Sequence, residues 1–128
     1  MVQQVTNGIK VSVKTKFNGT LYHKFRLRFS FNYQITIENQ SNDAVQLISR
    51  RWKIFDSLNN LEIVEGDGVI GEKPILDSKK SFTYSSFSIL CSPLGSMNGF
   101  FNMINFSTSK KFKVLIPSFQ LAVPSISN

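Results

Sequence analysis

Apolar and polar residues alternate with a period of two along much of the chain. The longest run covers residues 21–37, where the odd positions are mainly apolar and the even positions mainly polar, and a shorter run covers residues 9–14. Successive side chains of a β-strand point to opposite faces, so this pattern predicts antiparallel strands with one buried and one solvated face. The dipeptide Asn18-Gly19 lies between the two runs and predicts the turn of a hairpin.

The alternation changes phase in the second part of the chain. Val45 and Leu47 occupy odd positions, whereas Trp52 and Ile54 occupy even ones. This switch at residues 49–51 predicts either a β-bulge or a strand that crosses between two sheets.

Turns and further strands complete the predicted fold. Turn-forming residues at 57–60 and 77–80 precede expected strands, and no segment keeps a helical period over three turns. The expected later strands are residues 61–65, 81–85, 99–106 and 111–116. Seven or more short strands with frequent turns predict an all-β antiparallel sandwich.

The length fits a single domain with one core. A chain of 128 residues buries roughly two-thirds of its unfolded surface, and 41% hydrophobic against 18% charged residues excludes intrinsic disorder. We expect one domain over residues 1–123 and a flexible tail over 124–128. The single cysteine, Cys91, excludes an intramolecular disulfide and a zinc site built on several cysteines.

Targeting signals and membrane spans are not expected. The first residues have neither a basic nor an apolar signal region, which predicts a cytoplasmic protein. Residues 81–109 carry no charge, but Pro93, Gly95, Gly99 and several serines and asparagines interrupt them. Such groups are costly in hydrocarbon, so we expect no membrane insertion.

Positive charge is concentrated at the two ends of the chain. The net charge is +7, from 15 Lys and Arg against 8 Asp and Glu, and every carboxylate lies within residues 38–77. The alternation predicts one basic sheet face near the N-terminus. Its cations are Lys10, Lys14, Lys16, Lys24, Arg26 and Arg28.

This basic face raises the question of nucleic-acid binding. The strand period sends Phe25, Phe29 and Phe31 to the opposite, core face, so the basic face has no stacking platform beyond Tyr22. Six cations on one face are enough for non-specific phosphate contact. We favour a solvated face that maintains solubility, and nucleic-acid binding stays an alternative.

A glycine motif stands in the middle of the chain. Gly66, Gly68 and Gly71 form a formal G-x-G-x-x-G. A dinucleotide site requires a helix directly after this motif, but Pro74 disfavours helical backbone there, and no Lys-Ser or Lys-Thr pair supports a P-loop. We interpret the motif as a connection with positive φ angles, and its backbone amides stay a candidate weak anion site.

Candidate metal ligands and catalytic groups are few. The chain has one histidine, His23, and one cysteine, too few for a transition-metal site or a catalytic triad. A weak Mg²⁺ site is conceivable on the acidic cluster, although a solvated patch is the preferred interpretation. The cluster comprises Glu62, Glu65, Asp67 and Glu72. We expect no catalytic residues, no metal site and no cofactor.

Four blocks of sequence resemble the ApaG family in order and spacing. They are QLISRRW at residues 46–52, EGDGVIGEKP at 65–74, SPLGSMNG at 92–99 and FKVLIPSF at 112–119. The resemblance covers nearly the whole chain and implies a fibronectin type III-like or immunoglobulin-like sandwich. It also implies an association with cobalt resistance and magnesium efflux in bacteria, while related eukaryotic domains look like protein-interaction modules.

Two departures from the family pattern affect the surface. Arg51 stands where members often have His, and the commonly acidic connection between the first two strands is here FNGTLYH, residues 17–23. The resemblance therefore supports the fold but carries over no acidic metal or partner surface. It also implies no catalytic residue.

The leading hypothesis is a non-enzymatic protein that acts in Co²⁺/Mg²⁺ homeostasis through contacts with an unidentified protein. Exposed loops concentrate function, so we expect the partner surface on residues 66–74 and 92–99. The named candidates are Gly66, Asp67, Gly68, Lys73, Pro74, Ser92, Pro93, Gly95 and Ser96. Phosphate or nucleotide binding at the glycine motif, nucleic-acid binding by the basic face, and pairing into a homodimer stay open.

Overall fold

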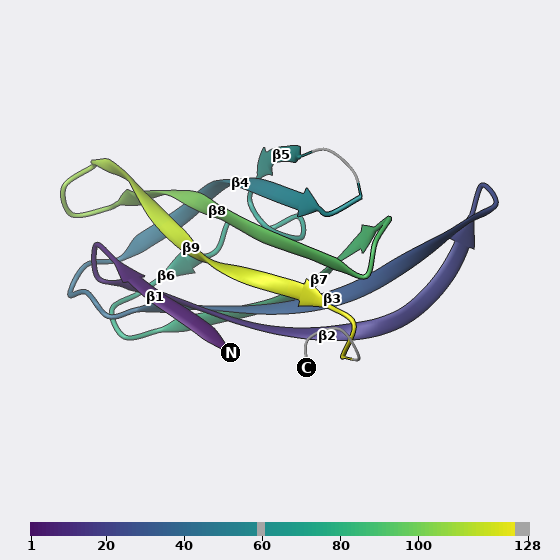
Figure 1. Ribbon diagram of the computed structural model, residues 1–128. Helices are drawn as coiled ribbons and strands as arrows, with labels where there is room; N and C mark the ends of the chain where they lie inside the picture. Colours follow the sequence, from purple (N-terminus) through teal and green to yellow (C-terminus); the bar gives the residue numbers. More distant parts are fainter. Residues whose placement is uncertain (59–60, 125–128) are drawn as a thin grey trace.

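The computed structural model describes residues 1–58 and 61–124, which form nine β-strands (Figure 1). Most of the tail expected at 124–128 therefore lies outside the described residues. The strands are β1 (Val2–Thr6), β2 (Ile9–His23), β3 (Arg26–Asn39), β4 (Val45–Asp56), β5 (Glu62–Asp67), β6 (Ile75–Leu76), β7 (Ser81–Leu90), β8 (Leu94–Asn105) and β9 (Lys111–Ala122).

The strands form two antiparallel sheets that pack face to face. The first sheet has the order β1-β2-β3-β7, and the second has the order β5-β4-β8-β9, with β6 paired to the start of β4. The predicted all-β sandwich is confirmed. Within the described part of the chain, no helix has the length and apolar character needed to cross a membrane.

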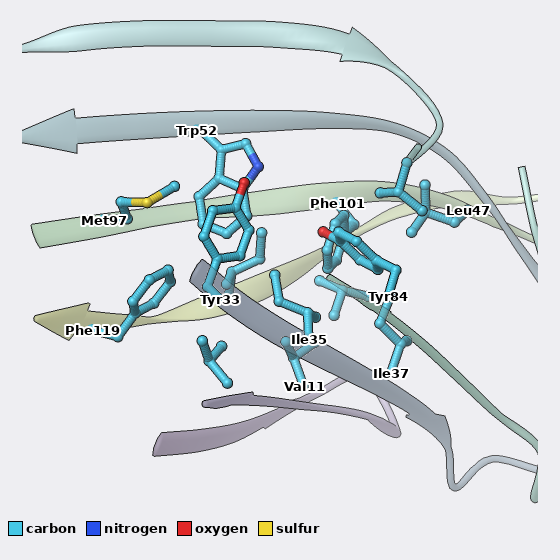
Figure 2. Packing of buried hydrophobic residues seen from close by; sticks show 14 of the residues in the cluster. Val11, Tyr33, Ile35, Ile37, Leu47, Trp52, Tyr84, Met97, Phe101 and Phe119 are labelled. Carbon is cyan, nitrogen blue, oxygen red and sulfur yellow. The ribbon is translucent and has the colours of Figure 1, made fainter. Parts of the chain in front are cut away.

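The inner faces of both sheets supply the core. Ile35 and Ile37 of β3 are fully buried, as predicted from their alternation. Tyr33 of the first sheet meets Trp52 of β4 and Phe119 of β9, with ring centroids 5.5 and 5.9 Å apart (Figure 2). Such tilted and edge-on aromatic contacts stabilise the packing of the two sheets beyond the area they bury.

The phase switch in β4 is a β-bulge. Leu47 pairs with Met103 and Ser49 pairs with Asn102, which leaves Ile48 as the extra residue. The bulge lies just before the predicted position, and β4 stays in the second sheet rather than crossing to the first. One extra residue in a strand shifts the buried side chains from odd to even positions.

The predicted position of the first hairpin turn was wrong. The turn is formed by Lys24 and Phe25, whose φ angles are 51° and 63°, as a type I′ turn between paired His23 and Arg26 requires. The Asn18-Gly19 dipeptide instead forms a bulge, because the pairing register shifts there. Glycine with a positive φ serves either feature, so the dipeptide alone could not distinguish them.

Residues 21–37 are therefore not one strand, and several side chains expected in the core are exposed. Phe25, predicted to lie in the core, is fully exposed at the turn, and Leu27 is 40% exposed. The distal part of the β2–β3 hairpin projects as an arm beyond the second sheet (Figure 1). We call residues 18–29 the arm from here on.

Candidate functional site

The glycine motif leads from an edge strand into a tight turn. It begins at the end of β5, which pairs antiparallel with β4, and it closes with a bridge between Val69 and Glu72. The two residues between them, Ile70 and Gly71, have φ angles of 43° and 77°. These values are typical of a type I′ turn, and the motif here follows an antiparallel strand rather than the parallel strand of a dinucleotide fold.

Three backbone amides of this turn donate hydrogen bonds to carbonyl groups within the chain. The amide of Gly68 donates to the Ile48 carbonyl at 2.7 Å, and the amides of Val69 and Glu72 donate to each other's carbonyls at 2.8 and 2.9 Å. Three amides that an anion would need are therefore directed inward. This geometry gives the phosphate-binding alternative little support.

Arg50 fixes the same turn from the neighbouring strand. Its Nη1 donates to the carbonyls of Asp67 at 3.1 Å and Gly68 at 2.7 Å. Gly68 has a φ of 59°, and a Cβ there would lie 2.1 Å from the Glu72 carbonyl oxygen. The motif thus needs glycine for its own backbone. Gly68 is buried and cannot belong to the predicted partner surface, whereas Asp67 and Lys73 are exposed.

The second predicted partner loop, residues 92–99, is not a loop. Most of it belongs to β8, which lies between β4 and β9. Gly95 and Gly99 permit close approach of β4, since added Cβ atoms would lie 2.4 Å from the Phe55 carbonyl oxygen and 2.0 Å from that of Arg51. Glycine thus marks strand packing here rather than a flexible loop.

The turn before β8 is held by a buried carboxylate. Asp56 accepts hydrogen bonds from the Ser92 hydroxyl and from the Cys91 amide, both at 2.6 Å. Ser92 is fully buried and Gly95 is buried too, so their assignment to a partner surface was wrong. Pro93 and Ser96 keep partial exposure.

The outer face of the second sheet is hollowed at two adjoining places. A hollow of about 360 Å³ opens there over β5, β4 and β8. It is lined by Ser49, Arg50, Arg51, Glu65, Gly66, Asp67, Phe100 and Asn102. A second hollow, also of about 360 Å³, shares Ser49 and Asn102 and extends to Lys111 and Lys113 of β9. We call the two hollows together the sheet groove.

Charge changes sign along the sheet groove. Glu65 and Asp67 lie at its β5 end, and Lys113 lies at its β9 end with Nζ 4.4 Å from the centre of the Phe100 ring. Between them, Arg51 Nε lies 3.4 Å from a Glu65 carboxylate oxygen. Arg51 Nε is buried and has no hydrogen-bond partner among the described residues, so this contact is an ion pair only.

Polar groups at the centre of the groove are ordered by pairing across the strands. The Asn102 amide donates to the Ser49 hydroxyl at 2.8 Å, beside the bulge at Ile48. The groove therefore combines an aromatic floor at Phe100, an amide and hydroxyl pair, and charges of both signs.

The acidic residues considered as a conceivable Mg²⁺ site do not come together in the structure. Within the described part of the chain, no three His, Cys, Asp or Glu side chains converge as metal ligands would. Glu65 faces the sheet groove, while Glu72 belongs to the glycine turn. The carboxylates that are close in sequence are thus distributed over a strand and the turn beyond it.

The six cations of the predicted basic face are spread along the hairpin. Lys14 and Lys16 lie opposite Gln34 and Asn32, whereas Arg28 lies opposite Leu21 in the arm. The two strands are neighbours, as predicted, but their cations do not face one another. Lys10 pairs with Glu38, and β3 spans about 40 Å from Arg26 to Glu38. The six cations therefore form a line along the hairpin rather than one compact patch.

Sequence reasoning missed the groove side chains of β8. Phe100 and Phe101 are adjacent, and a strand sends neighbours to opposite faces. Phe101 is fully buried, so Phe100 has to face outward. This signal was readable, but the pairing that brings Phe100 beside Arg51 and Lys113 spans some sixty residues of sequence and required the sheet topology.

The two sheets define a β-sandwich domain, and the outer face of its second sheet carries a groove lined by charges of both signs. A model of the ApaG domain matches residues 21–105, and the chain belongs to the ApaG family. It is 42% identical to Protein ApaG of Vibrio cholerae over 120 residues, 94% of each chain. It is 39% identical to Protein ApaG of Anaeromyxobacter dehalogenans over 128 residues, all of both chains.

Solved structures agree with this assignment. A crystal structure from Bordetella pertussis that carries the name ApaA protein has a TM-score of 0.80 at 30% identity, covering 91% of this chain and 94% of that one. An X-ray structure of a structural-genomics target has a TM-score of 0.89 at 33% identity, covering 94% and 90%. The family resemblance inferred from the four sequence blocks is confirmed.

Proposed function

We propose that this ApaG-family chain is a non-enzymatic module that supports Co²⁺/Mg²⁺ homeostasis by binding another protein in the sheet groove. The observation that carries the protein contact is the groove itself, where Phe100 lies between Arg51 and Lys113 on the outer face of the second sheet. Aromatic and arginine side chains dominate the binding energy of protein interfaces. The link to divalent cations comes from the family resemblance alone.

The groove supports a protein partner of a particular chemistry. Lys113 and Arg51 favour a carboxylate placed beside the Phe100 ring, and Glu65 with Asp67 favours a cation at the other end. A peptide with an acidic residue at one end and a basic residue at the other pairs with both ends of the groove in one orientation. In the opposite orientation each of its charges meets a like charge of the groove. The groove thus favours one orientation of its partner.

A functional test compares two charge reversals on the same strand. Arg51→Glu places a carboxylate in the groove beside Glu65, while Lys53→Glu makes the same change two residues further along β4, outside the hollows. In the native organism with the gene deleted, the wild-type chain and Lys53→Glu should restore Co²⁺ tolerance and Arg51→Glu should not. Full restoration by Arg51→Glu would contradict the groove as the functional surface.

A second test concerns the indirect nature of the cation link. Calorimetry of the purified chain with Co²⁺ and with Mg²⁺ should show no stoichiometric binding. An affinity tighter than about 10 µM, about 7 kcal/mol, would mean that the chain holds the metal itself and would contradict action through protein contacts. Cytoplasmic location and pairing into a homodimer stay predictions.

A further inference from the structure

The apolar side chains of β3 become more exposed from the body of the sandwich toward the tip of the arm. Phe31 of β3 is 1% exposed, Phe29 is half-buried, Leu27 is 40% exposed and Phe25 at the turn is fully exposed. Figure 1 shows the hairpin continuing past the ends of β4 and β8.

The strand register separates the side chains of the arm into two faces. Residues directly opposite in an antiparallel pair share a face. Tyr22 pairs with Leu27, on the face that continues the core, and Tyr22 is 77% exposed. His23 pairs with Arg26 and Leu21 with Arg28, on the outer face. The arm is therefore amphipathic, with an aromatic and aliphatic face and a cationic face.

The charge of the arm has no carboxylate nearby in sequence to balance it. The first 37 residues contain six Lys and Arg and no Asp or Glu. Lys24 forms half of the turn, next to Phe25, and Arg26 follows it directly. Arg28 contacts the Cys91 sulfur at the base of the arm, which leaves Lys24 and Arg26 as the most distal cations. The surface complementary to the arm is anionic.

We propose that the arm docks on the surface of an anionic lipid bilayer. The apolar face, with Tyr22 and Leu27, and the exposed ring of Phe25 at the turn enter the boundary between headgroups and acyl chains, and the cationic face lies at the level of the lipid phosphates. A segment with one apolar and one cationic face binds membranes in this way, through buried apolar area and attraction to anionic lipids. This contact is peripheral, and it does not depend on the sheet groove.

Two features favour a lipid surface over single-stranded nucleic acid. Nucleic-acid binders place stacking aromatics among the cations that hold the phosphates, on one face. In the arm the register places Tyr22 and Arg26 on opposite faces. The apolar face also includes the aliphatic Leu27, which provides no flat ring for a base but is suited to the acyl boundary.

Vesicle co-sedimentation of the full chain tests the proposal. Vesicles of phosphatidylcholine alone are compared with vesicles containing 30% phosphatidylglycerol, at low and at physiological salt. The wild-type chain should bind only the anionic vesicles, and salt should weaken the binding. Phe25→Ser should weaken it about tenfold or more, because that variant loses the burial of a whole aromatic side chain.

A matched pair of charge variants separates the arm from the overall charge. Lys24→Glu with Arg26→Glu should weaken binding by at least about 20-fold, since each cation near an anionic surface contributes about fivefold. Lys80→Glu with Lys110→Glu removes the same charge at the opposite end of the molecule. Lys80 accepts a hydrogen bond from Asn39, the last residue of β3, and Lys110 from Asn105. This control should bind like the wild type.

Three results of these binding measurements would overturn the proposal or part of it. If both double variants lost vesicle binding equally, the binding would depend on the overall charge and not on the arm, which would overturn the proposal. Binding that Phe25→Ser leaves unchanged would overturn the apolar contact. Binding of a single-stranded oligonucleotide but not of anionic vesicles would assign the arm to nucleic acid instead. All variants lie at exposed positions, and an unchanged thermal melting curve verifies their fold.

Discussion

The β2–β3 hairpin has two halves with the same alternation and opposite environments. In the inner half, Phe31, Ile35 and Ile37 of β3 are covered by the second sheet and fully buried. In the arm, Leu27 continues the same row but is 40% exposed, and Phe25 at the turn is fully exposed. Alternation therefore shows which side chains share a face of a sheet. It does not show whether another element covers that face.

The largest expected effect contrasts one phenylalanine from each half. Phe31→Ala removes a fully buried ring, packed 5.4 Å from Phe17, and should lower the free energy of unfolding by about 3–5 kcal/mol. Phe25→Ala removes a fully exposed ring and should change it by less than about 0.5 kcal/mol. Urea denaturation measures both. Similar losses would show that the arm is packed against the body in solution.

A second contrast uses glycines in the two regions. A Cβ at Gly99 would lie 2.0 Å from the Arg51 carbonyl oxygen, so Gly99→Ala should force the strands apart and lower stability by about 3 kcal/mol. A Cβ at Gly19 in the arm would meet nothing within 4 Å, and only its φ of 98° opposes substitution. Gly19→Ala should cost about 1–2 kcal/mol. A larger loss at Gly19 would contradict the difference in packing.

These contrasts show how far sequence reasoning reached. Alternation predicted the sandwich and the buried rows, because those depend on a local period of two. It missed the turn at Lys24 and Phe25, because neither residue favours the positive φ that the turn imposes. It read 92–99 as a loop from Pro93 and the glycines, although Gly95 and Gly99 are required by the close approach of β4.

The candidate site was less predictable than the fold. The glycine motif was located correctly, but its role as a turn held by Arg50 depends on hydrogen bonds across strands. The sheet groove joins Glu65, Arg51, Phe100 and Lys113 from four strands. Their proximity follows from strand order, which pairs residues far apart in sequence.

A smaller effect concerns a tyrosine beside the inner half. Tyr84 of β7 pairs with Ile35, and burial raises the pKa of its hydroxyl well above the ordinary value of 10.0, with a further rise from nearby Tyr33 and an opposing effect from Arg50. Above pH 10 the unfolded chain loses this proton and the folded chain keeps it. Stability should therefore fall as pH rises, by up to about 1.4 kcal/mol per pH unit.

Tyr84→Phe provides the check on this alkaline loss. The variant should flatten the decline in stability between pH 10 and 11, measured by urea denaturation at each pH. At pH 7 it should be at least as stable as the wild type, because the buried hydroxyl has no hydrogen-bond partner among the described residues and its removal relieves a desolvation cost. An unchanged alkaline slope in Tyr84→Phe would contradict the assignment.

Amide hydrogen exchange along the β2–β3 hairpin tests the central claim most directly, because it reports on both halves in one experiment. Amides of residues 31–37 should exchange only through global unfolding, and those of residues 21–28 at least about a hundredfold faster. Anionic vesicles should slow exchange in the arm and leave the inner half unchanged. Equal protection along the whole hairpin, or an arm that vesicles do not protect, would contradict the account.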